Sequence, residues 1–234
     1  MSAYGIQHAL LVQPNSGYNE DNRCLLHTIA NSHGRLKGIA VVGNDASRSE
    51  LEDLAAQGIV GIAMNPALYG TNHYADAGHL LERLAELGLL AQIQVQNEQL
   101  PALLPMLNAT SARLLIDHCG RPDIAAGLQQ EAFQALLQLG RTGRACIKLS
   151  GYAKFSQQAF PYEDTWPYIH ELIRAFTLDA CLWASDWPFL RAPERIDYGV
   201  LLSLVERLIP DPKDRAKLFW ETPRAWLGFV SEAT

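Results

Sequence analysis

Two residues whose side chains could activate water follow apolar runs of the sequence. Asp186 comes just after the run Ala180–Ala184, and His118 follows the run Arg113–Asp117. A carboxylate in a desolvated pocket has a raised pKa and can act as a general base for water, and an imidazole can polarise or position a carbonyl group. We therefore predict Asp186 and His118 as catalytic residues, with capping of a turn as the alternative role for each.

Two lysines are further candidates for the site of Asp186 and His118. Lys148 lies in the apolar run Ala145–Leu149, where its side chain faces away from those of Ile147 and Leu149. A charged group in a buried strand is costly unless it is paired, so Lys148 either forms an ion pair with a carboxylate or contributes to substrate binding. Lys154 follows a few residues later and is either solvated or available to bind a substrate carboxylate.

Four uncharged polar residues also lie where apolar runs stop. We predict them as substrate-binding residues: Gln13, Asn65, Gln94 and Tyr152. In a barrel of parallel strands, the side chains that follow the carboxyl ends of the strands share one face, and active sites are built on that face. The assignment of these residues therefore depends on the fold class.

A regular alternation of short apolar runs with longer amphipathic runs predicts that fold class. The predicted strands are His8–Val12, Gly38–Val42, Ile59–Asn65, Leu89–Val95, Arg113–Asp117, Ala145–Leu149 and Ala180–Ala184. The predicted helices are Asp21–Ser32, Ser47–Gln57, His73–Leu87, Leu100–Leu107, Gln129–Leu139, Thr165–Phe176, Val200–Leu208 and Pro212–Leu227. Such alternation indicates an α/β fold with a parallel sheet covered by helices, which we predict as a single domain over residues 1–234.

The number of predicted strands bears on the kind of sheet. No G-x-G-x-x-G or phosphate-binding loop follows any predicted strand, which disfavours an open nucleotide-binding sheet. A (β/α)₈ TIM barrel needs eight strands, and we predict seven, so we expect a barrel that lacks its first strand. Unpaired strand edges are a liability, and a helix, a shift of strands or a partner chain, as in a homodimer, is expected to cover them.

Charge and composition exclude several other classes of protein. The formal net charge of −6 disfavours a nucleic-acid partner, because phosphate contacts require a basic surface. No apolar run is long enough to span a membrane, and no basic segment followed by an apolar one indicates a signal peptide. The four cysteines lack C-x-x-C spacing, and three of them lie in apolar runs as expected for buried, reduced thiols, so we expect a cytoplasmic protein.

Several segments, in this order, resemble the amidohydrolase-related family, in the branch that contains 2-pyrone-4,6-dicarboxylate lactonase and similar sugar-lactone hydrolases. The matching segments are Leu11–Pro14 with Asp21-Asn22, Arg35–Val41, Ile116–Pro122, Lys148–Gly151, Leu182–Pro188 and Thr222–Phe229. The resemblance implies a (β/α)₈ barrel in which Asp186 activates the hydrolytic water and His118 ends the fifth strand of the family. It places Lys154 near an anionic substrate, with Tyr152 and Gln13 lining the same mouth.

Three departures from the family pattern bear on the cofactor and the substrate. The H-x-H motif of the family's first strand is absent, so we expect the original reading frame to extend upstream of Met1 by roughly one strand and one helix. Both arginines of a G-x-R-G-x-R stretch are replaced in Gly58–Ala63, and Gln94 stands where many members have histidine. These two departures suggest a different, less anionic substrate than those of the family members. Zinc in a catalytic site needs about three protein ligands, and His118 and Asp186 supply two, so zinc, manganese and no metal all stay open.

These observations favour a hydrolase of a lactone or related cyclic ester, with a small-molecule substrate that bears a carboxylate. Two alternatives stay open. One is a metal-dependent decarboxylase or amide hydrolase of the same family. The other is a truncated barrel that binds a ligand without turnover, which the missing H-x-H motif favours and the retention of Asp186, His118 and Lys148 opposes.

Overall fold

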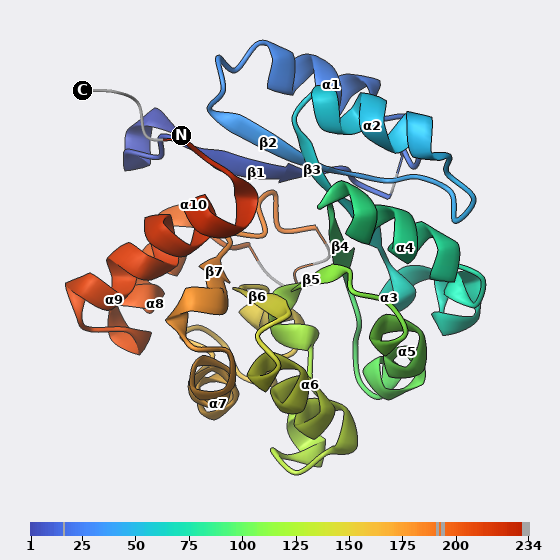
Figure 1. The fold of residues 1–234 in the computed structure, drawn as a ribbon. Helices are drawn as coiled ribbons and strands as arrows, with labels where there is room; N and C mark the ends of the chain where they lie inside the picture. Colours follow the sequence, from blue (N-terminus) through green and yellow to red (C-terminus); the bar gives the residue numbers. More distant parts are fainter. Residues whose placement is uncertain (16, 191, 193–194, 231–234) are drawn as a thin grey trace. The chain divides into compact units, whose positions relative to one another are not determined.

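A computed structural model describes residues 1–15, 17–190, 192 and 195–230 of the chain. Seven strands form in these residues, and their order in the sheet follows their order in the sequence, from β1 to β7 (Figure 1). The chain divides into two compact units. Of the described residues, the first unit contains those within Met1–Gln94, Leu103–Leu115 and 227–230, and the second contains those within Val95–Ala102 and Ile116–Trp226.

Parallel strands form the centre of the first unit. These are β1 (Ala9–Val12), β2 (Leu36–Ala40), β3 (Ile59–Met64), β4 (Leu90–Ile93) and most of β5 (Arg113–Ile116). Ala9 of β1 lies opposite Leu36 of β2, and Gly61 of β3 lies opposite Leu90 of β4. Gly61 is required there, because a Cβ atom at this position would lie 2.6 Å from the Leu90 carbonyl oxygen. The runs predicted as strands are confirmed, with ends that differ by a few residues.

The helices of the first unit follow their strands. They are α1 (Arg23–Ala30), α2 (Arg48–Ala56), the short α3 (Pro66–Tyr69) and α4 (Gly78–Leu87), and α5 (Gln99–Asn108) has residues in both units. Ser47 caps α2 by accepting a hydrogen bond from the Glu50 amide, the usual role of a serine at this position. Gly88 ends α4 in the left-handed conformation.

One predicted helix begins later than its sequence pattern indicates. The run His73–Leu87 forms a helix only from Gly78, and a separate turn occupies Thr71–Tyr74. The Tyr74 hydroxyl accepts a hydrogen bond of 2.7 Å from the Asn65 backbone N–H, and the Tyr74 side chain is buried. This contact after β3 holds the backbone in the turn, and helical periodicity alone does not reveal it.

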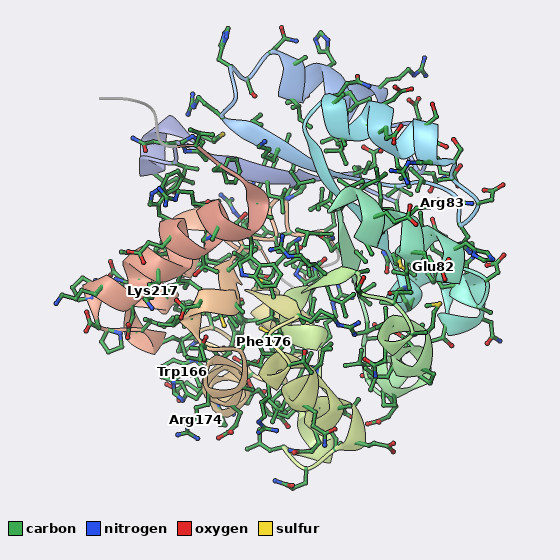
Figure 2. All side chains as sticks on the ribbon, viewed as in Figure 1. Glu82, Arg83, Trp166, Arg174, Phe176 and Lys217 are labelled. Atoms are coloured by element: carbon green, nitrogen blue, oxygen red, sulfur yellow. The ribbon has the colours of Figure 1, made fainter. Side chains whose placement is uncertain are left out.

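The second unit contains strands β6 (Ala145–Leu149) and β7 (Cys181–Trp183), which pair in parallel with Lys148 opposite Leu182. Helices α6 (Glu131–Arg141) and α7 (Trp166–Phe176) pack together through the Phe133 and Tyr168 rings, whose centroids are 4.9 Å apart. Phe176, labelled in Figure 2, fills the space beside Gly140, where a Cβ atom would lie 2.5 Å from its ring. These contacts fix the helices that cover β6.

The last part of the chain forms α8 (Tyr198–Leu208), α9 (Pro212–Ala216) and α10 (Thr222–Leu227). The predicted helix Pro212–Leu227 is interrupted by a wider, π-helical turn at Lys217–Glu221. Within the described residues, no helix is long and apolar enough to cross a membrane. Three of the four cysteines are buried and Cys24 is exposed. That residues 1–234 form a single domain stays a prediction.

Candidate active site

The carboxyl ends of β5, β6 and β7 carry the residues of the candidate site, all of which lie in the second unit. Asp117 and His118 follow β5, Lys148 lies in β6, and Asp186 follows β7. The expectation that Asp186, His118 and Lys148 converge is confirmed, since His118 contacts both Asp186 and Asp117, and Asp117 forms an ion pair with Lys148. The strand ends therefore bring together residues that are up to about 70 positions apart in the sequence.

The His118 imidazole lies at the centre of this group. Its Nε2 atom is 3.3 Å from Asp117 Oδ2 and 3.3 Å from Asp186 Oδ1. On the other side of the ring, Nδ1 is 3.0 Å from the hydroxyl of Ser150. The imidazole thus contacts two carboxylates through one nitrogen and a hydroxyl group through the other.

Each carboxylate has its own lysine. Lys148 Nζ lies 3.2 Å from Asp117 Oδ1, so the ion-pair alternative for Lys148 is the arrangement that the structure contains. Lys154 Nζ is 3.0 Å from Asp186 Oδ1 and 2.8 Å from Asp186 Oδ2 and therefore contacts both oxygens of that group. The Asp186 side chain is 17% exposed, whereas the Asp117 side chain is 5% exposed. Only Asp186 of the two is partly open to solvent.

The environment sets the charge of the buried groups. Burial alone would raise the pKa of Asp117, but the positive charges at His118 and Lys148 act against it and lower the pKa to about 2. Burial lowers the pKa of His118 to about 4, despite the carboxylates of Asp117 and Asp186, which favour its protonated form. His118 is therefore neutral at pH 7, and the positive charges that then favour the Asp117 carboxylate are those of Lys148 and Arg121.

An unusual backbone conformation carries the imidazole. Four consecutive residues after β5 have positive φ: His118 at 47°, Cys119 at 56°, Gly120 at 72° and Arg121 at 45°. Asp186 also has a positive φ, 59°. Each non-glycine residue in this region costs roughly 1–3 kcal/mol, and such residues cluster at functional sites. Both segments that supply His118 and Asp186 thus contain strained backbone, although residues with positive φ also occur elsewhere in the chain.

The lowered pKa of His118 predicts a pH dependence of stability. The unfolded imidazole takes up a proton near pH 6.5 and the folded one near pH 4, so in this window the unfolded chain binds more protons. We therefore expect the free energy of unfolding to fall as the pH decreases from 6.5 to 4. Urea unfolding at a series of pH values measures this, with His118→Gln for comparison. If the free energy of unfolding changes equally with pH in the two proteins, His118 is not the cause of the pH dependence.

The other predicted site residues have different surroundings. The buried Tyr152 donates its hydroxyl hydrogen to the Leu149 carbonyl oxygen at 3.0 Å. In the first unit, the buried Gln13 donates to the backbone carbonyls of Asn19 and Asp21, and Asn65 caps α3. The side chain of Gln94 is half-buried. The role of Tyr152, Gln13, Asn65 and Gln94 in substrate binding stays a prediction.

Two contributors to the site were not predicted as site residues. Asp117 bridges Lys148 and His118, and Ser150 contacts His118 from a fully buried position. The adjacency of Asp117 to His118 and the alternation of Lys148 with Ser150 along one strand were signals for both. Two surface depressions, of about 290 and 350 Å³, are lined by other residues.

A comparison with family models decides the classification of the chain. The amidohydrolase model matches residues 1–229. The chain belongs to the amidohydrolase family. This confirms the family and the TIM-barrel fold class that the motifs after β5 and β7 predict. The chain is accordingly an enzyme of the hydrolase class.

Amidohydrolases similar to this chain include lactone hydrolases. It is 32% identical to the 4-sulfomuconolactone hydrolase of Rhizobium radiobacter over 98% of this chain and 78% of the relative. It is 25% identical to the 2-pyrone-4,6-dicarboxylate hydrolase of Comamonas testosteroni over 88% of this chain and 71% of the relative. A probable 2-pyrone-4,6-dicarboxylic acid hydrolase from Acinetobacter baumannii, solved with citric acid bound, has a TM-score of 0.87 at 29% identity, over 97% of this chain and 86% of that one.

Two more distant solved structures contain metal ions. A Burkholderia multivorans amidohydrolase with bound zinc has a TM-score of 0.82 at 20% identity, over 98% of this chain and 86% of that one. A Polaromonas dihydroxybenzoic acid decarboxylase with bound manganese has a TM-score of 0.62 at 15% identity, over 97% of this chain and 83% of that one. At these identities the comparison concerns the fold alone, and a metal in this chain has to be judged from its own residues.

Proposed function

We propose that this amidohydrolase hydrolyses a lactone that carries a carboxylate or sulfonate group. The observation that carries the proposal is the contact of His118 with the partly exposed Asp186, which is itself held by Lys154. The lactone hydrolases similar to the chain support this substrate class, because their names specify sulfo-substituted and dicarboxylate compounds. The site contains a base for water, a polar group for a carbonyl and a cation for an anion.

Asp186 is the better base of the two carboxylates. Both carboxylates are paired with a lysine, but Asp117 is enclosed and has its pKa lowered to about 2, so it binds a proton weakly. Asp186 is partly exposed, so a water molecule can reach it. In the proposed reaction, Asp186 takes a proton from water as the oxygen attacks the lactone carbonyl carbon, and the proton passes to the ring oxygen when the acyl–oxygen bond breaks.

His118 assists at the carbonyl group. Being neutral at pH 7, the imidazole carries one N–H, which can donate to the carbonyl oxygen while negative charge develops there. Because burial and the left-handed backbone fix the ring, little reorganisation is needed when that charge forms. His118 therefore stabilises the tetrahedral intermediate, and Asp186 generates the nucleophile.

The residues of this site do not fit a tightly bound divalent metal. Within the parts of the chain that the structure describes, no group of three or more His, Cys, Asp or Glu residues could hold a metal ion. Both carboxylates next to His118 are in contact with a lysine ammonium group, which occupies the position that a cation would take. The proposed mechanism therefore contains no step at a metal.

Lys154 is proposed to bind the anionic group of the substrate. A substrate carboxylate offers this ammonium a second partner, so Lys154→Met should raise KM for an anionic lactone by roughly 10–150-fold, which corresponds to one charge-assisted hydrogen bond. The KM for a neutral lactone of similar size should rise much less. Initial rates on matched anionic and neutral lactones measure both effects.

The matched control is Lys217→Met, which removes a lysine from an exposed ion pair with Asp179. We expect its KM values to equal those of the unaltered enzyme. If Lys154→Met changes KM equally for anionic and neutral lactones, Lys154 does not bind the anion. If the unaltered, folded protein opens no lactone of either kind, the proposed function itself is wrong.

A further inference from the structure

The two nitrogens of His118 have neighbours of opposite character. Nε2 faces Asp117 Oδ2 and Asp186 Oδ1, each at 3.3 Å. Carboxylate oxygens accept hydrogen bonds and do not donate them when ionised. Nδ1 faces the Ser150 hydroxyl at 3.0 Å, and a hydroxyl group can either donate or accept. The neighbours thus make one nitrogen a required donor and leave the role of the other to Ser150.

We propose that Ser150 is a positioning residue that fixes the tautomer of the neutral His118 ring. Its hydroxyl donates a hydrogen bond to Nδ1, and the ring hydrogen is carried by Nε2, toward Asp117 and Asp186. The consequence for catalysis rests on the proposed function, in which the substrate carbonyl oxygen joins the two carboxylates as a further acceptor for the Nε2–H group. The tautomer itself is a property of the resting protein and does not depend on the substrate.

The opposite tautomer would place the electron-rich Nε2 lone pair against the negatively charged oxygens of two carboxylates. With the hydrogen on Nδ1, the Nε2 lone pair would face two carboxylate oxygens with no hydrogen between them. The Ser150 hydroxyl would then accept from Nδ1, and its own hydrogen would need another acceptor. Ser150 is fully buried, and His118 is the side-chain partner found for its hydroxyl among the described residues. Both considerations favour the hydrogen on Nε2.

The residue after Ser150 contributes to the same restraint. Gly151 has a positive φ of 67°, and a Cβ atom there would lie 2.9 Å from His118 Cβ and 3.0 Å from both Cγ and Nδ1. The absence of a side chain lets the backbone after β6 approach the imidazole closely. Ser150 and Gly151 therefore hold the ring by a hydrogen bond and by direct packing, and the proposal assigns the choice of tautomer to the hydrogen bond.

Nitrogen NMR of the histidine ring tests this directly. The full chain is labelled with ¹⁵N-histidine at neutral pH, and the His118 signals are assigned by their loss in His118→Gln. We expect a protonated Nε2 and an unprotonated Nδ1 in the unaltered protein. In Ser150→Ala, both tautomers should be populated, and kcat on an anionic lactone should fall about tenfold with little change in KM, as expected for loss of one hydrogen bond.

Two further variants separate this role from general structural damage. Ser150→Thr keeps the hydroxyl and should restore the signals of the unaltered protein. Thr165→Val removes another fully buried hydroxyl, which donates to the Tyr162 carbonyl oxygen, and should leave the His118 signals unchanged. A protonated Nδ1 in the unaltered protein, or His118 signals in folded Ser150→Ala that match the unaltered protein, would overturn the proposal. If the NMR signals show the expected tautomer but the protein hydrolyses no lactone, the positioning role of Ser150 is supported and the proposed function is rejected.

Discussion

Replacing Asp186 with asparagine is expected to lower kcat for lactone hydrolysis by about 10²–10⁴-fold, the usual contribution of a general base. The amide has nearly the same size and can still contact Lys154 and His118, so the fold should be kept. Asparagine cannot take a proton from water, and the loss should therefore appear in kcat. Steady-state kinetics together with circular dichroism of both proteins measure the effect and check the fold.

The control for this substitution is Asp179→Asn. Asp179 forms an exposed ion pair with Lys217, which is labelled in Figure 2, and has no contact with the site residues. Its kcat should stay at the value of the unaltered enzyme. If Asp186→Asn, correctly folded, turns over an anionic lactone at near the original rate, Asp186 is not the base.

Replacing Lys148 with methionine should destabilise the protein strongly. The substitution keeps the length of the side chain but leaves the enclosed Asp117 carboxylate without its ammonium partner. Breaking a buried ion pair on one side costs about 3–5 kcal/mol. For a chain of this size, this corresponds to a decrease in Tm of roughly 6–20 °C, measurable by calorimetry or thermal circular dichroism.

Two comparisons isolate the cause of this decrease. The double variant Lys148→Met with Asp117→Asn also removes the carboxylate charge that Lys148 balanced and should regain much of the lost stability. Lys217→Met breaks an exposed pair and should change Tm little. A Tm for Lys148→Met equal to that of the unaltered protein would show that Asp117 does not depend on Lys148 for its charge.

Much of the fold could be predicted because the local signals agree with one another. Apolar runs of strand length, such as Ala145–Leu149, alternate with amphipathic helices, and Ser47 and Gly88 mark helix ends by well-understood local chemistry. The later start of α4 depends on a hydrogen bond from Asn65 to Tyr74, which is tertiary. The wider turn at Lys217–Glu221 comes directly before Thr222 and Pro223, and a proline inside a helical run removes a backbone hydrogen bond, a signal that the apolar pattern of Pro212–Leu227 does not take into account.

The main residues of the site could be predicted from the sequence, but the contacts between their side chains could not. Asp186 and His118 could be found because both follow strands, and parallel strands present their carboxyl ends on one face. The pairing of Lys154 with Asp186 could not be found, because it depends on the conformation of two loops. Likewise, the role of Ser150 becomes visible only when the side of the His118 ring that it contacts is known.

The central claim is that this site delivers water to the carbonyl carbon of an anionic lactone. Turnover of such a lactone in ¹⁸O-labelled water, followed by mass spectrometry of the product, tests it most directly. The proposed mechanism predicts ring opening in proportion to protein concentration, with one solvent oxygen in the new carboxylate and none in the released hydroxyl group. Ring opening no faster than in buffer, or a label in the hydroxyl group and not in the carboxylate, would contradict it.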